Sequence, residues 1–224
     1  MELKFAVPKS LNDIPLHRYQ KLITKENPTD EDSLVCLLDI NKENVKHIKQ
    51  EDFNYMVDIS KELFKQETPL VRTFTLDGVS YGFIPKLDDI TYGENKDITR
   101  YLPDWGQMHK AMAVLYRPIN KKIGMKYMID SYEGSHLHSE ALKKMPLSIA
   151  LGASIFFYAL IRDLLNYTQN YLEMQQKDLK TKKIFQTSEL DSQPNGDHTQ
   201  NYILLLKETL QSLKKLQKRD YINA

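Results

Sequence analysis

The sequence is poor in cysteine and glycine and has almost no net charge. Its only cysteine, Cys36, cannot form a disulfide within the chain, and the apolar stretch LVCLLDI around it predicts a small buried side chain. This cysteine usage favours a reducing compartment, or a particle assembled in one. Eight glycines in 224 residues favour helices over a β-sandwich. With 31 basic and 30 acidic residues, the overall charge gives no argument for binding nucleic acid or an anionic membrane.

The sequence also predicts neither a secretory signal nor a clear membrane-spanning segment. The first ten residues, MELKFAVPKS, contain no basic stretch followed by a long apolar one. The apolar run at residues 145–161 is at the lower limit for crossing a bilayer, and its helical pattern continues into Arg162 and Asp163 without a boundary. We therefore expect a buried central helix rather than a membrane span, and no membrane contact.

Apolar residues at helical spacing occupy most of the chain. After a short strand expected at residues 2–7, residues 15–65 predict about four helices, one of them capped by Asn41. Thr91 and Glu94 have the spacing of a capping box, and Asp104 should cap a helix over residues 104–116. A short helix is expected within SHLHSEALKKM, and a long one from Pro146 to about residue 177.

The clearest β signal is the stretch RTFTLDGVSYGF, residues 72–83. Asp77 and Gly78 tolerate the positive φ angles of a type I′ turn, which predicts a two-residue β-hairpin. In that register five apolar side chains share one face of the hairpin: Phe74, Leu76, Val79, Tyr81 and Phe83. An isolated hairpin is marginal in water, so this face should rest either on the chain's own helices or on a neighbouring subunit.

Together these elements predict a mainly α fold with a small β component, of the α+β class. We expect a helical bundle with a protruding hairpin, formed by residues 1–177, then a flexible polar linker at residues 178–199. Residues 200–224 should form an amphipathic C-terminal arm that docks on another chain. The apolar stripe of this arm comprises Tyr202, Leu206, Leu210, Leu213 and Leu216.

No catalytic, cofactor-binding or metal-binding pattern stands out. His136 and His138 are separated by one residue at an expected helix start, a spacing that suits a solvated helix start better than a metal site. The stretch KLDDITYGE lacks the alternating oxygen ligands of a calcium loop. His109 could act as a general base, but a lone histidine beside an apolar stripe is more often a packed residue. We therefore predict no cofactor and no enzymatic activity.

Aromatic and apolar side chains instead suggest contacts with other proteins, because aromatic residues and methionine are enriched at protein interfaces. The interface candidates are Phe74, Tyr81, Phe83, Trp105, Tyr202, Leu206, Leu210, Leu213 and Leu216. For the run DWGQMHKAMAVLYRPI, which contains Trp105, the helical spacing also predicts an internal packing face.

Two stretches in the middle of the chain resemble a known type of protein. FIPKLDDITYGE followed by DWGQMHKAMAVLYRPI, within residues 83–119, is similar to virion proteins of crAss-like tailed bacteriophages, with a weaker similarity in LNDIPLHRYQKLI. The resemblance covers roughly a quarter of the chain and marks no catalytic motif. It implies a structural subunit of a ring or head–tail adaptor beneath the portal.

This resemblance sets the expected function and partners. Such phages build these rings from twelve copies around a DNA channel, so the implied partners are further copies of this chain, the portal and other tail or ring proteins, with passive contact to genomic DNA. The expected location is the portal and tail region of the virion, after synthesis in the host cytoplasm. Two alternatives stay open: a tail-assembly chaperone that binds a tail protein transiently, and an enzyme of unknown type.

Overall fold

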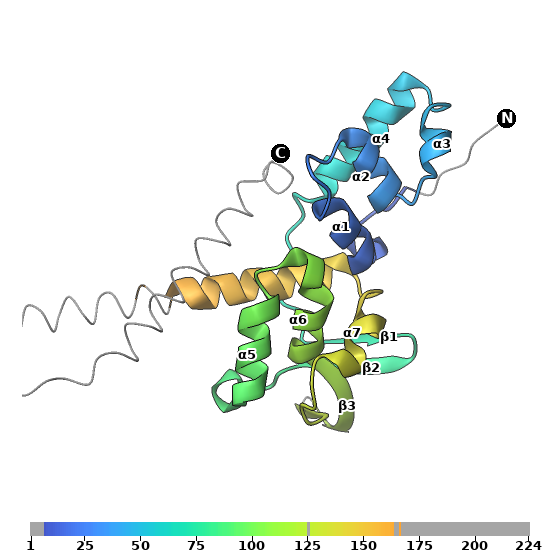
Figure 1. Cartoon of the computed structure of the whole chain (residues 1–224). Helices are drawn as coiled ribbons and strands as arrows, with labels where there is room; N and C mark the ends of the chain where they lie inside the picture. The colour runs from blue at the N-terminus through green and yellow to red at the C-terminus, as the bar shows by residue number, and fades with distance from the viewer. Residues whose placement is uncertain (1–6, 125, 164–165, 167–224) are drawn as a thin grey trace, which may run out of the picture. The chain divides into compact units, whose positions relative to one another are not determined.

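The computed structural model describes residues 7–124, 126–163 and 166 (Figure 1). Among these, one compact unit extends to Ile155 and a second begins at Phe156. Helices predominate beside one four-stranded antiparallel sheet, so the predicted mainly helical α+β class is confirmed. The predicted linker at 178–199 and arm at 200–224 lie outside the described residues, as does the predicted N-terminal strand except for Val7.

The N-terminal part is the expected group of four helices. These are α1 (Leu16–Ile23), α2 (Asp30–Leu37), α3 (Lys42–Val45) and α4 (Gln50–Leu63), preceded by the short η1 (Leu11–Asp13). Thr29 and Asp32 form a capping box on α2, and the Asn41 side chain accepts the Glu43 amide hydrogen as the predicted cap of α3. A shared apolar core joins α2, α3 and α4; its buried members are Leu34, Leu38, Ile40, Val45, Met56 and Val57.

The four strands are β1 (Thr73–Leu76), β2 (Val79–Phe83), β3 (Tyr116–Ile123) and β4 (Lys126–Ile129), and they are adjacent in sequence order. The predicted hairpin register is confirmed, with Phe74 opposite Tyr81 and Leu76 opposite Val79. Asp77 and Gly78 have φ angles of 47° and 82°, as the predicted turn requires.

Between β2 and β3 lie η2 (Leu87–Asp89), α5 (Tyr92–Tyr101), η3 (Trp105–Gln107) and α6 (Met108–Leu115). The capping box of Thr91 and Glu94 and the cap formed by Asp104 are confirmed. The single helix expected over residues 104–116 is corrected: it begins as a 3₁₀ turn, and Tyr116 already belongs to β3. Seven of the eight residues of α6 are buried, so nearly all sides of the helix lie in the core and not only its predicted apolar stripe.

After β4 come α7 (His136–Leu142) and the long helix, which begins at residue 147 and is described through 163. Up to Ser154 most of its side chains are buried. At Gly152 an added Cβ would lie 2.4 Å from the Pro69 carbonyl oxygen, so only glycine allows this close approach. Among the described residues, no helix is long and apolar enough to cross a membrane.

The start of α1 is bonded to the start of the long helix, far along the chain. The Leu16 and His17 amides donate to the carbonyl oxygens of Met145 and Lys143, at 2.8 and 2.9 Å. In return the Leu147 amide donates to the Ile14 carbonyl oxygen at 2.8 Å. These three bonds close the first unit by joining its N-terminal helices to its C-terminal end.

The apolar face of the β1–β2 hairpin packs inside the chain. Tyr81 and Phe83 are buried, Phe74 and Leu76 are half-buried, and only Val79 near the turn is exposed. Phe74 stacks on Tyr81 with ring centroids 5.4 Å apart and meets the Tyr116 ring edge-on at 5.2 Å. The sequence left open whether this face packs on the chain itself or on a neighbouring subunit; in the structure it packs on the chain's own core.

Candidate functional site

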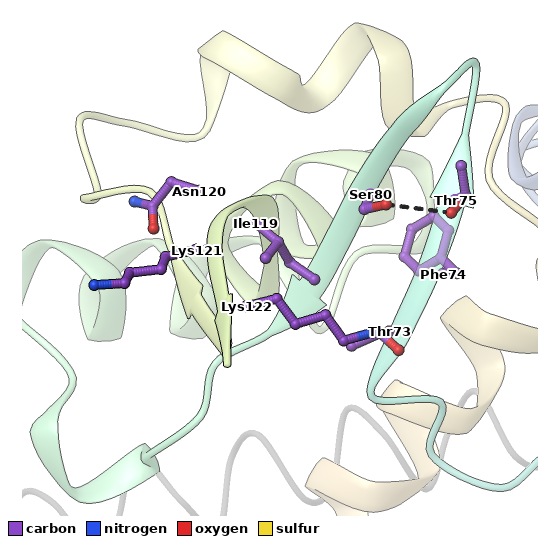
Figure 2. A pocket seen from close by; sticks show the side chains of 8 residues that line it. All are labelled: Thr73, Phe74, Thr75, Ser80, Ile119, Asn120, Lys121 and Lys122. Carbon is purple, nitrogen blue, oxygen red and sulfur yellow. Dashed lines mark hydrogen bonds between the residues drawn. The ribbon is translucent and has the colours of Figure 1, made fainter. Parts of the chain in front are cut away.

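A groove opens where β3 separates from β2. Only Tyr116, Arg117 and Pro118 of β3 pair with β2; from Ile119 onward β3 pairs with β4 alone, after a break in register between Ile119 and Lys121. The space between the two hairpins is about 350 Å³ (Figure 2). Hydroxyl, apolar and basic side chains line it: Thr73, Phe74, Thr75, Ser80, Ile119, Asn120, Lys121 and Lys122.

The β3–β4 hairpin carries basic and apolar side chains on its outer face. Lys121 lies opposite Met128, and Ile123 lies opposite Lys126, so these four side chains share one face, which we call the hairpin face. All four are exposed, with Ile123 at 65% and Met128 at 59%. In the described part of the chain neither lysine has an ion-pair partner. In Figure 2 the Lys121 side chain points away from β1 and β2, whereas Lys122 reaches across the groove toward Thr73.

Tyr127 holds the β3–β4 hairpin against β2. Its hydroxyl donates to the Phe83 carbonyl oxygen at 2.8 Å, and its ring covers Gly82. Burial raises the pKa of Tyr127, against a smaller opposite effect of Arg72. The phenol therefore stays a neutral donor at ordinary pH, which keeps this attachment intact.

A buried ion pair fixes the other end of β3. The Arg117 Nη2 atom lies 2.6 Å from Glu94 Oε1, and both side chains are less than a tenth exposed. Glu94 Oε2 also accepts the Thr91 amide hydrogen at the start of α5. The Arg117 guanidinium lies over the Tyr132 ring, whose hydroxyl donates to Asp97 Oδ2 at 2.5 Å. One network therefore ties β3 to the first two turns of α5.

His109 belongs to a second buried network, which joins α1, η3 and α6. The Gln20 side-chain nitrogen lies 3.0 Å from His109 Nδ1, and it donates to the Trp105 and Gly106 carbonyl oxygens at 2.9 and 3.0 Å. An amide nitrogen can only donate, so the contact with His109 requires an unprotonated Nδ1, and the two amide hydrogens are shared among three acceptors. Burial, and then the charge of Lys143, lower the pKa of His109. Of the two roles considered for His109, general base and packed residue, this geometry favours the packed residue.

The predicted interface residues fall into three groups. Tyr81, Phe83 and Trp105 are buried in the chain's own core, so their selection as interface residues is corrected: the same apolar character serves internal packing. Phe74 is half-buried and contributes one wall of the groove. Five candidates lie outside the described residues: Tyr202, Leu206, Leu210, Leu213 and Leu216.

Among the described residues, the other histidines and charged residues that the sequence singled out form no reactive cluster. His136 is exposed, and the His138 ring meets Tyr81 edge-on at 6.4 Å. Arg162 and Asp163 are exposed and contact each other at 3.2 Å. Within the described residues no three His, Cys, Asp or Glu side chains are placed to hold a metal ion.

Comparison with known proteins adds no relative. No protein-family model matches the chain, and neither curated proteins nor solved structures give a match. The function must therefore be argued from the residues and their arrangement.

The β3–β4 hairpin and its exposed face were not predicted from the sequence. Four basic residues and no acidic residue occur between Tyr116 and Ile129, in a chain that is otherwise nearly balanced. Gly124, at φ 59°, lies between two runs of strand formers, which is a hairpin signal. These two local features could have identified the site.

Proposed function

We propose that this chain is a structural subunit of a virion: a protein that assembles with further copies of itself into a ring or adaptor at the portal of a tailed phage. The observation that carries the proposal is the position of the resembling block, residues 83–119. It builds the centre of the first unit, from the end of β2 through α5 and α6 to β3. The Glu94–Arg117 ion pair and the Asp104 cap lie within this block, and the block supports one outward-facing element, the β3–β4 hairpin.

This arrangement suits assembly better than catalysis. A rigid body that presents a charged and apolar hairpin offers a surface for another protein. The buried histidine and the buried ion pair each have an identified packing partner, so neither needs a substrate to account for it. On this proposal the chain carries out no chemical step, and its partners are further copies, the portal and neighbouring tail proteins.

Quantitative mass spectrometry of purified phage particles tests this function. A ring subunit should be present in a fixed ratio to the portal protein. A tail-assembly chaperone should be made in infected cells but missing from finished particles. Absence from the particle, together with retention on a tail protein in cell extracts, would replace the ring proposal with the chaperone. Imaging of the particle with this chain labelled then places it at the portal or elsewhere.

A further inference from the structure

The exposed side of α4 is the chemical counterpart of the hairpin face. Glu51, Tyr55, Asp58 and Glu62 are spaced by four, three and four residues, so they lie on one side of the helix. All four are exposed, with Tyr55 at 65%. We call this set the α4 face. Its opposite side, with Met56, Val57, Ser60 and Leu63, is buried.

Within the described residues, the carboxylates of the α4 face have few ion-pair partners. In the described residues Glu51 and Asp58 have no ion-pair partner, and Glu62 has only Lys65, one turn away on the surface. By comparison, Asp89 is paired with Lys86 and Asp39 with Arg18. The α4 face is therefore an acidic surface with an exposed aromatic ring at its centre.

We propose that the hairpin face of one copy docks on the α4 face of the next. Lys121 and Lys126 would meet the carboxylates, while Ile123 and Met128 would cover the Tyr55 ring. The occupant of each surface is thus a second copy of this chain. The two faces are complementary because their charges are opposite and each carries exposed apolar groups. This inference rests on the proposed function, since it specifies how copies would join in a ring.

The two faces have the relationship that ring assembly requires. A head-to-tail interface needs two different complementary surfaces on one subunit, so that each copy offers one and receives the other. Both faces belong to the first compact unit, and α4 and β3 are drawn well apart within it (Figure 1). Two anchors fix the orientation of the hairpin before it meets a partner: Tyr127 is bonded to Phe83 of β2, and Arg117 is paired with Glu94 of α5.

Charge reversal with rescue tests the pairing in the full chain. The variants are Lys121→Glu with Lys126→Glu, and Asp58→Lys with Glu62→Lys, measured by sedimentation velocity and native mass spectrometry at low salt. Each pair should weaken self-association by at least about tenfold, because like charges then face each other. An equimolar mixture of the hairpin variant and the α4 variant should form heteromeric pairs, since the reversed surfaces again attract. Lys42→Glu with Lys46→Glu, which changes two exposed lysines of the α3 region, is the matched control and should leave association unchanged.

A second measurement does not depend on charge. Chains carrying Met128→Cys and Tyr55→Cys, each with Cys36→Ala, are mixed and oxidised. Docking predicts a disulfide-linked heterodimer, whereas Met128→Cys with Tyr92→Cys, another exposed aromatic position, should give none.

Three outcomes would overturn the docking proposal. They are a wild-type chain that stays monomeric, reversals that leave association unchanged, and reversals that abolish only retention of duplex DNA. The last would make the hairpin a nucleic-acid contact. None of these outcomes changes the particle composition, so the ring proposal stands or fails separately by mass spectrometry of the virion.

Discussion

The ring of Tyr127 lies so close to the backbone of Gly82 that a Cβ on that glycine would be 2.5 Å from Tyr127 Cε2. Real Cβ atoms do not approach that closely, so the tyrosine could not keep its place beside any other residue. The absence of a side chain at Gly82 therefore leaves the space in which Tyr127 attaches the β3–β4 hairpin to β2. Aromatic cover of a strand glycine also restores the packing that the missing side chain leaves open.

Gly82→Ala is expected to displace Tyr127 and break its bond to the Phe83 carbonyl. We expect a loss of about 1–3 kcal/mol of unfolding free energy, as for an overpacked core, measured by urea denaturation. In a Tyr127→Ala background the same change should cost clearly less, because only the 3.0 Å approach to Ile119 Cγ1 then remains. Gly93→Ala is the control, since its Cβ would meet Tyr132 at an ordinary 3.5 Å. Equal losses in both backgrounds would refute the Gly82–Tyr127 contact.

The hairpin side chains should lose stability in the order of their burial. Phe83→Ala, at a position 2% exposed, is expected to cost about 3–5 kcal/mol. Phe74→Ala removes a half-buried ring that contacts Tyr81 and Tyr116, so about 2 kcal/mol is expected. Val79→Ala, near the exposed turn, should cost less than about 1 kcal/mol. If Val79→Ala proved the most damaging of the three, the packing described for this face would be wrong.

Glu94→Gln should destabilise the fold by about 3–5 kcal/mol, because it leaves the Arg117 charge buried without its partner. The amide oxygen can still accept the Thr91 amide hydrogen, so loss of the cap is not the cause. Adding Arg117→Met should recover part of the loss, because the unpaired charge is removed with the arginine. Asp89→Asn, which breaks an exposed pair with Lys86, is the comparison and should change stability by less than about 1 kcal/mol. Additive losses in the Glu94 and Arg117 double variant would contradict this account.

His109 should make stability depend on pH. Its pKa in the folded state is below the ordinary 6.5, so between those two values the unfolded chain binds more protons. The free energy of unfolding is then complete above about pH 6.5 and falls as the pH drops toward the folded pKa. His109→Gln should flatten this decline in urea titrations between about pH 7.5 and about pH 5.5.

Local signals accounted for most of the fold. The Asp77–Gly78 turn, the capping box of Thr91 and Glu94 and the cap at Asn41 were all predictable, because each depends on residues within a few positions of one another. The apolar stripe of α4 was equally clear, since helical spacing alone defines it.

What the sequence could not reveal depends on residues far apart in the chain. No sequence pattern links Arg117 to its partner Glu94 or His109 to Gln20, because the residues of each pair meet only in the tertiary structure. The interface candidates Tyr81, Phe83 and Trp105 show the same limit: an aromatic side chain has the same pattern whether its neighbour is its own core or another chain. The exposed hairpin face was missed because the strand boundaries of β3 and β4 had not been set.

The backbone bonds between α1 and residues 143–147 also affect the order of events during synthesis. The amides of Leu16 and His17 cannot form their bonds until the carbonyl oxygens of Met145 and Lys143 have left the ribosome, long after α1 itself. Helices α1–α4 can form early, but their attachment to the rest of the first unit cannot be completed until the start of the long helix has been translated. Non-local closure of this kind slows folding and leaves apolar surface uncovered for longer. A nascent chain that stalls before residue 143 would thus display the end of α1 without these bonds.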